Sequence, residues 1–151
     1  MLQPNIFLNE SFGKCLFIIF DLLCGLLILK INQLDDHNSQ SGLIFWFYNP
    51  ITIAISSRGN AESIMSFLVL IFIYYLLKKS FITAGCLYAV AIHFKIYPIT
   101  YAFAIFLFIV FDNKVVCFKN FFKKKVFIRL MKFSLSFILT IASLTIYFYK
   151  E

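Results

Sequence analysis

Apolar residues along the chain fall into six runs that short polar stretches separate. The runs are Cys15–Leu29, Leu43–Ser56, Ile64–Leu77, Phe81–Phe94, Tyr97–Phe111 and Phe133–Tyr149. They are long and show no alternation with period two, which favours helices over strands. A helix needs roughly 18 residues to cross a hydrocarbon layer of about 27 Å. Several runs are shorter, so we expect them to recruit flanking polar residues or to end at a water-filled recess, where irregular backbone is tolerated.

Composition decides the environment of these helices. Of the 151 residues, 62% are hydrophobic and only 14% are charged, whereas soluble domains average about 45–50% apolar and about 25% charged residues. This argues against a soluble enzyme, a disordered tail and a nucleic-acid-binding domain. Pro50 and Pro98 fit helix beginnings, where a missing N–H costs least. Since no internal repeat is visible, we predict one all-α membrane domain over residues 1–151, a polytopic bundle of about six transmembrane helices.

The basic residues, which give a net charge of +7, are divided unevenly between the two sides of such a bundle. One side would hold Lys30, Lys78, Lys79, Lys114, Lys119, Lys123, Lys124, Lys125, Arg129 and Lys132, and the other Lys14, Arg58, Lys95 and Lys150. The positive-inside rule assigns the richer side to the cytoplasm. Residues 114–132 mix Phe and Val with Lys, so they are a candidate amphipathic segment at the cytoplasmic interface. The alternative interpretation is a loop that only sets topology.

Two short polar loops lie on the side that the charge rule disfavours. They are Ser56–Ser63 (SSRGNAES) and His93–Pro98 (HFKIYP). Arg binds phosphate oxygens through two hydrogen bonds, Lys adds a point charge, and Asn and Glu suit sugar hydroxyls. A lipid-linked phosphosugar needs this combination at headgroup depth. The predicted substrate-binding residues are Arg58, Asn60, Glu62, His93, Lys95 and Tyr97. The alternative is that the charges only snorkel at helix ends and that His93 is a hydrogen-bonded helix-end residue.

Two longer strings carry a resemblance to a known family. FWFYNPITIAISSRGNAES, followed some thirty positions later by AIHFKIYPITY, resembles the GPI mannosyltransferase I family (PIG-M type), which belongs to the GT-C class of multi-span glycosyltransferases. The likeness begins near Phe12, includes Phe20–Leu23 and fades after about Tyr101. It implies a GT-C-type fold in the endoplasmic reticulum membrane and a small stabilising membrane subunit.

The resemblance also implies a reaction. Members of this family transfer the first mannose of the GPI anchor from dolichyl-phosphate mannose to glucosaminyl-(acyl)phosphatidylinositol, forming an α1,4 linkage on the luminal face. The family's acidic DXD-type motif has no counterpart here, because only Glu10 is acidic before Phe12. No catalytic residue, metal ligand or cofactor is therefore assigned. We expect the chain to be an internal fragment of a larger multi-span enzyme or a truncated gene model, and on its own to transfer no mannose.

Other carboxylates in the chain are candidate replacements for the missing motif. Asp35 and Asp36 lie on the predicted cytoplasmic side and indicate a solvated loop. Asp21 is an intramembrane carboxylate, with either a functional role or a neutral or hydrogen-bonded structural role between helices. Glu62 pairs with Arg58, binds a sugar or acts as the catalytic base.

Two alternative functions stay open at this stage. The chain is either a non-catalytic remnant of the family or a transporter or scaffold fragment whose luminal charges serve topology or ion passage. A transporter is expected to show paired half-repeats and interrupted helices in matching positions, and none is visible in the sequence. No nucleic-acid partner is expected.

Overall fold

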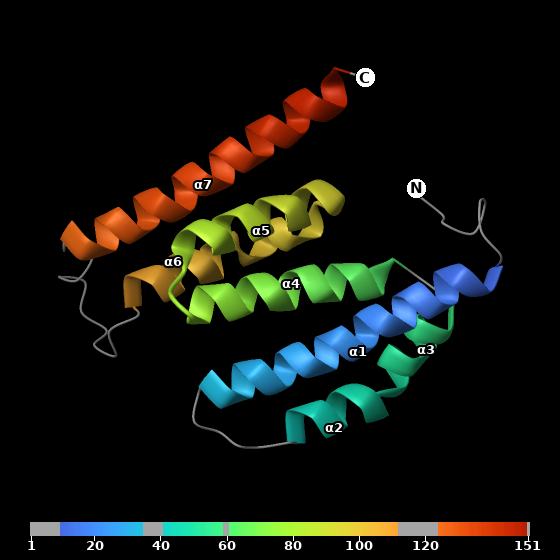
Figure 1. The fold of residues 1–151 in the computed structure, drawn as a ribbon. Helices are drawn as coiled ribbons and strands as arrows, with labels where there is room; N and C mark the ends of the chain where they lie inside the picture. Colours follow the sequence, from blue (N-terminus) through green and yellow to red (C-terminus); the bar gives the residue numbers. More distant parts are fainter. Residues whose placement is uncertain (1–9, 35–40, 59–60, 112–123, 151) are drawn as a thin grey trace. The chain divides into compact units, whose positions relative to one another are not determined.

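The computed structural model describes residues 10–34, 41–58, 61–111 and 124–150, and this part of the chain is helical with no strand. The all-α prediction is therefore confirmed. The helices group into two compact units, Met1–Lys78 and Lys79–Glu151. Each unit is described below by itself (Figure 1). The number of transmembrane helices, the GT-C-type fold and the single domain stay predictions.

The first unit contains three helical passes, the second of which is broken. Helix α1 (Glu10–Leu34) and helix α4 (Glu62–Leu77) run in the same direction (Figure 1). The chain between them forms α2 (Ser41–Tyr48) and α3 (Pro50–Arg58), which together run in the opposite direction. The rings of Phe20 and Phe67 meet edge to face at 5.3 Å between centroids, where α1 packs on α4. Gly42 lets α2 approach α1 closely: an added Cβ would lie 3.1 Å from Asn32 Nδ2.

The second unit is built on two parallel helices, α5 (Phe81–Phe94) and α7 (Lys124–Tyr149). The guanidinium of Arg129 lies 5.7 Å from the ring centroid of Phe81 at one end, and His93 stacks on Phe148 at the other. Between them in the chain, the 3-10 helix η2 (Tyr97–Tyr101) and α6 (Ala102–Phe111) return in the opposite direction (Figure 1). The basic first turns of α7 therefore lie at the opposite end of this unit from His93.

Small residues make the contact between α5 and α7 close. A Cβ on Gly85 would lie 2.8 Å from the carbonyl oxygen of Phe133, so the two backbones nearly touch there. The Ser136 hydroxyl donates to the Ile82 carbonyl at 2.7 Å and lies 3.0 Å from Cys86 Sγ, and the Thr140 hydroxyl donates to the same sulfur at 3.3 Å. Small side chains and interhelical hydrogen bonds of this kind hold membrane helices together where lipid removes the hydrophobic driving force.

Among the helices that the structure describes, two are long and apolar enough to cross a membrane. They are Cys15–Leu34 within α1 and Lys124–Tyr149, and only 28% and 11% of their most apolar stretches are buried inside the structure. Large side chains such as Leu135, Ile138 and Ile146 project outward from α7. A core helix of a soluble protein is mostly buried, whereas lipid accommodates exposed apolar side chains. This exposure, together with the composition, indicates a membrane protein.

The helix boundaries differ from the predicted runs at several points. α1 runs from Glu10 to Leu34, beyond the predicted Cys15–Leu29 at both ends. α7 begins at Lys124 and not at Phe133, so the described residues of the candidate amphipathic segment, 124–132, form the first turns of a long helix. Val126 is buried there and starts the inward stripe that continues at Phe133, which explains why the helix extends through the lysines. Residues 114–123 lie outside the described residues. The run Leu43–Ser56 is broken at Asn49, and the run from Tyr97 begins as a 3-10 turn.

Candidate functional site

The break between α2 and α3 lies one helix before the first predicted loop. The backbone carbonyl of Asn49 accepts from the Ile53 N–H at 3.1 Å, and its side-chain oxygen accepts from the Ile51 N–H at 3.0 Å. Asn49 therefore caps α3, and Pro50 takes the first helical position, where its missing N–H is not needed. The Asn49 side chain gives the Ile51 N–H an acceptor, and Pro50 has no N–H that needs one. Backbone N–H groups without an acceptor would be costly to place in hydrocarbon.

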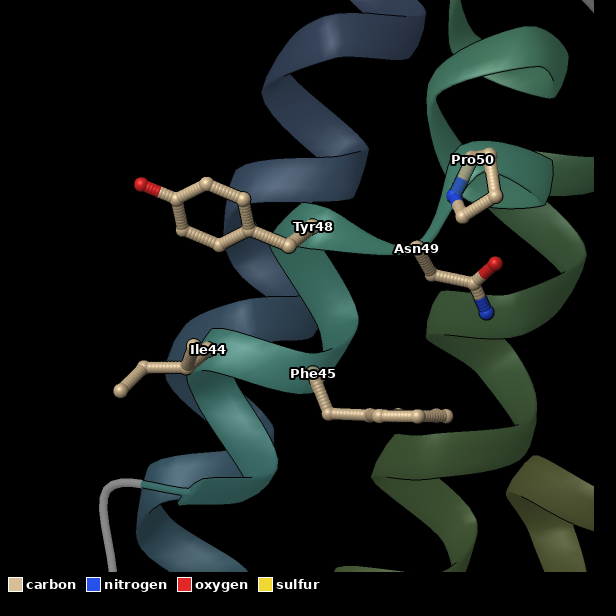
Figure 2. Close-up of a pocket in the computed structure, with 5 residues that line it drawn as sticks. All are labelled: Ile44, Phe45, Tyr48, Asn49 and Pro50. Atoms are coloured by element: carbon tan, nitrogen blue, oxygen red, sulfur yellow. The ribbon is translucent and has the colours of Figure 1, made fainter.

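A groove of about 590 Å³ opens at this break. Figure 2 shows its lining, with Phe45 and Asn49 projecting to one side of the junction and Tyr48 to the other. Ile44 and Pro50 complete the lining. The groove is mostly apolar, with the Asn49 amide and the Tyr48 hydroxyl as the polar side-chain groups of its lining. It contains none of the predicted substrate-binding residues.

The first predicted loop joins α3 to α4. Arg58 is the last residue of α3 and Glu62 the first residue of α4, where a carboxylate is favoured by the helix dipole. Asn60 and the side chain of Arg58 lie outside the described residues. Ser63, one residue later, is buried, and its carbonyl faces Cys24 Sγ of α1 at 3.9 Å. The end of the loop is thereby fixed against α1.

Asp21 lies close to this junction, on the buried face of α1. Its side chain is 8% exposed, and within the described residues its Oδ2 has no hydrogen-bond partner. The Ser63 hydroxyl is likewise buried and unsatisfied in that part of the chain. No hydrogen bond that would support a structural role for Asp21 is seen at this oxygen within the described residues, and its functional and structural roles both stay predictions. Asp35 and Asp36 lie outside the described residues.

The second predicted loop continues from the end of α5. The Lys95 N–H donates to the Ala91 carbonyl at 3.1 Å, and the Lys95 backbone then becomes extended. The imidazole of His93 stacks on Phe148 of α7, with 5.0 Å between ring centroids and 29° between planes. Tyr97 opens η2 and is 47% exposed. His93, Lys95 and Tyr97 therefore gather at one end of the second unit.

The six predicted residues are divided between the two units. Arg58, Asn60 and Glu62 belong to the first unit, and His93, Lys95 and Tyr97 to the second. Sequence reasoning did not single out Asn49 or Phe148. The Asn-Pro pair is a helix-start signal that was available in the sequence. The contact between His93 and Phe148 joins residues 55 positions apart and has no sequence signal.

Comparison with known proteins decides the family. A family model described as "Mannosyltransferase (PIG-M)" matches residues 55–151. The chain belongs to the PIG-M mannosyltransferase family. The match includes α7, so the likeness extends beyond Tyr101, where we expected it to fade. No solved structure matches the chain.

Three relatives illustrate the PIG-M similarity. The chain is 36% identical to "GPI mannosyltransferase 1" of Dictyostelium discoideum, over 99% of the chain and 37% of that protein. It is 38% identical to "GPI mannosyltransferase 1" of Saccharomyces cerevisiae, over 76% of the chain and 29% of that protein. It is 41% identical to "GPI alpha-1,4-mannosyltransferase I, catalytic subunit" of Danio rerio, over 70% of the chain and 28% of that protein. The chain thus spans between a quarter and two fifths of the length of these relatives.

Proposed function

We propose that this chain is part of a GPI mannosyltransferase and binds its lipid-linked phosphosugar substrates. Membership of the PIG-M family carries the proposal, since the matched region 55–151 includes both predicted loops in full. The reaction implied is transfer of mannose from dolichyl-phosphate mannose to glucosaminyl-(acyl)phosphatidylinositol with an α1,4 linkage, on the luminal face of the endoplasmic reticulum. The protein is proposed to be multi-pass and to bind a small membrane subunit.

The proposed reaction is a displacement at an anomeric carbon with a phosphate leaving group. Its oxocarbenium-like transition state builds negative charge on the departing phosphate, so fixed cations lower the barrier. We assign this role to Arg58 and Lys95. Asn60, Glu62, His93 and Tyr97 are assigned to hydroxyl and phosphate contacts with the substrates. A carboxylate base would take the proton of the acceptor hydroxyl, and no residue of this chain is assigned to that step.

A chimera tests the proposed function. This chain replaces the matching part of the Saccharomyces cerevisiae relative, and the product is expressed in yeast cells that lack their own enzyme; we call it the yeast chimera. We expect it to restore GPI-anchored protein at the cell surface and to mannosylate the glucosaminyl lipid in microsomes. A chimera that is abundant and membrane-inserted but makes no mannosylated lipid would contradict the proposal.

The proposed topology makes a separate prediction. Arg58 and Lys95 are expected to face the lumen, and Lys78 and Lys124 the cytosol, because the richer set of basic residues stays inside. The measurement is labelling of the single-cysteine variants Ser57→Cys and Lys78→Cys with an impermeant thiol reagent in sealed microsomes. Only Lys78→Cys is expected to react before the vesicles are opened. Equal labelling of both variants from outside would overturn the topology.

A further inference from the structure

The Tyr88 side chain connects three elements of the second unit. Its hydroxyl donates to the Pro98 carbonyl at 3.1 Å and lies 3.4 Å from the Ile99 carbonyl. Its ring packs against Phe133 and Phe137 of α7, at centroid distances of 6.0 and 5.3 Å. The side chain is only 3% exposed. Because the Tyr88 hydroxyl is buried and donates to the Pro98 carbonyl, it restricts the movement of the backbone at Pro98.

The backbone that the Tyr88 hydroxyl contacts belongs to the turn between α5 and η2, which contains the second predicted loop. After α5 the chain is extended at Lys95, with φ −147° and ψ 138°, and then folds into the 3-10 helix that begins at Tyr97. The Lys95 N–H anchors the start of this turn on Ala91, and the Tyr88 hydroxyl anchors its end on Pro98. The residues between these two anchors include Tyr97.

The Pro98 carbonyl lies inside the 3-10 helix, whose i→i+3 hydrogen bonds have poorer geometry than those of an α-helix. Inside a membrane no water is present to strengthen the contacts of such a carbonyl. The Tyr88 hydroxyl, delivered from the preceding helix, adds a donor to this carbonyl and selects one geometry of the turn.

Helix α7 holds this arrangement from the other side. Phe133 and Phe137 fix the Tyr88 ring, and Phe148 stacks on His93. None of the predicted substrate-binding residues lies on α7. This helix therefore acts on the second predicted loop only indirectly, through these three aromatic contacts.

We propose that Tyr88 is a positioning residue: its hydroxyl holds the Lys95–Pro98 turn in the one geometry that presents Lys95 and Tyr97 to the anionic headgroup of the lipid-linked sugar. This proposal rests on the proposed function and deepens it. Displacing a binding group by about 1 Å can cost about 10²-fold in rate, so loosening the turn is enough to impair catalysis.

Tyr88→Phe in the yeast chimera tests the proposal, because it removes the hydroxyl and keeps the ring between Phe133 and Phe137. We expect kcat per enzyme molecule to fall about ten-fold or more, while protein abundance stays near that of the parent. Tyr75→Phe on α4 is the matched control, since it also removes one hydroxyl, and it is expected to keep the parental kcat. If Tyr88→Phe instead lowers only abundance and leaves kcat unchanged, Tyr88 is merely structural and the proposal is wrong.

A spectroscopic readout separates this proposal from the proposed function. Ile96 is 76% exposed within the turn, so a nitroxide on Ile96→Cys, in the 151-residue chain with Cys15 and Cys117 changed to Ser, reports the mobility of the turn. We expect Tyr88→Phe to raise this mobility and Tyr75→Phe to leave it unchanged. Unchanged mobility in Tyr88→Phe overturns the proposal even where the parent chimera is active. An inactive parent chimera with a Tyr88-dependent spectrum overturns the proposed function alone.

Discussion

Arg58→Ala in the yeast chimera is expected to lower turnover about 10²–10³-fold at normal protein abundance, the usual cost of removing a preorganised donor from a developing negative charge. The position supports this expectation. Arg58 ends α3 and is followed in the sequence by Gly59, at the end of the helix where we propose that the substrate phosphates bind. Arg58→Lys keeps the charge but loses the two-hydrogen-bond geometry of the guanidinium, and we expect it to restore only a small part of the activity.

The matched control for Arg58 is the other arginine of the chain. Arg129 lies on α7 with its guanidinium over the Phe81 ring, at the opposite end of its unit from His93 and Lys95. Arg129→Lys is therefore expected to keep activity close to that of the parent. Mannosylated lipid and enzyme abundance should be measured together in all variants. Normal activity in Arg58→Lys, with activity that follows abundance in Arg58→Ala, would leave the phosphate role without support.

Gly85→Ala is expected to destabilise the second unit by about 1–3 kcal/mol, the usual cost of forcing extra atoms into a packed contact. The new Cβ would lie 2.8 Å from the Phe133 carbonyl oxygen and 3.2 Å from Ser136 Cβ. The Phe133 oxygen belongs to the backbone and cannot rotate away, so α5 and α7 must separate. Separation also weakens the hydrogen bond from Ser136 to Ile82. The measurement is the free energy of unfolding of the 151-residue chain in SDS titrations.

Gly42→Ala is the control for this effect of packing. The nearest atoms to its new Cβ are side-chain atoms, Asn32 Nδ2 at 3.1 Å and Ile28 Cγ2 at 3.3 Å, and both side chains can adjust. Alanine also favours the helix by about 1 kcal/mol over glycine. We expect its free energy of unfolding to stay near that of the parent. Equal losses in Gly85→Ala and Gly42→Ala would contradict the close contact between α5 and α7.

The sequence pattern predicts the helices well because their apolar runs are longer than buried strands usually are. It misses the start of α7 at Lys124, because the lysines before Phe133 interrupt the apolar run and their mixture with Phe and Val predicts a separate segment at the membrane interface. Val126, Phe133 and Ser136, which form the buried stripe of α7, already have helical spacing in the sequence and indicate a helix that begins before Phe133. The break at Asn49 was only half predicted: Pro50 indicates a helix beginning, but a separate α2 ending at Tyr48 was not expected.

The candidate site was predicted from local strings, and only local features could be found that way. SSRGNAES and HFKIYP carry the charged residues and the family resemblance in consecutive positions. The contact from Tyr88 to Pro98 and the stacking of His93 on Phe148 depend on how α5, η2 and α7 pack. Such contacts leave no periodic signal in one sequence, so the residues that hold the loop in place were missed although the loop itself was found.

The unequal helix lengths have a consequence for how the protein is made. α1 and α7 are apolar and long enough to cross a membrane. α2 and α3, with 8 and 9 residues, span roughly 12 and 14 Å each at 1.5 Å per residue, which is too short for either to cross a hydrocarbon layer alone. In the proposed multi-pass protein we expect α2 and α3 to enter the membrane as one segment, joined at the capped Asn49 junction and supported by α1. The polar loop from Ser56 to Ser63 would then be delivered across the membrane late, by helices that depend on their neighbours.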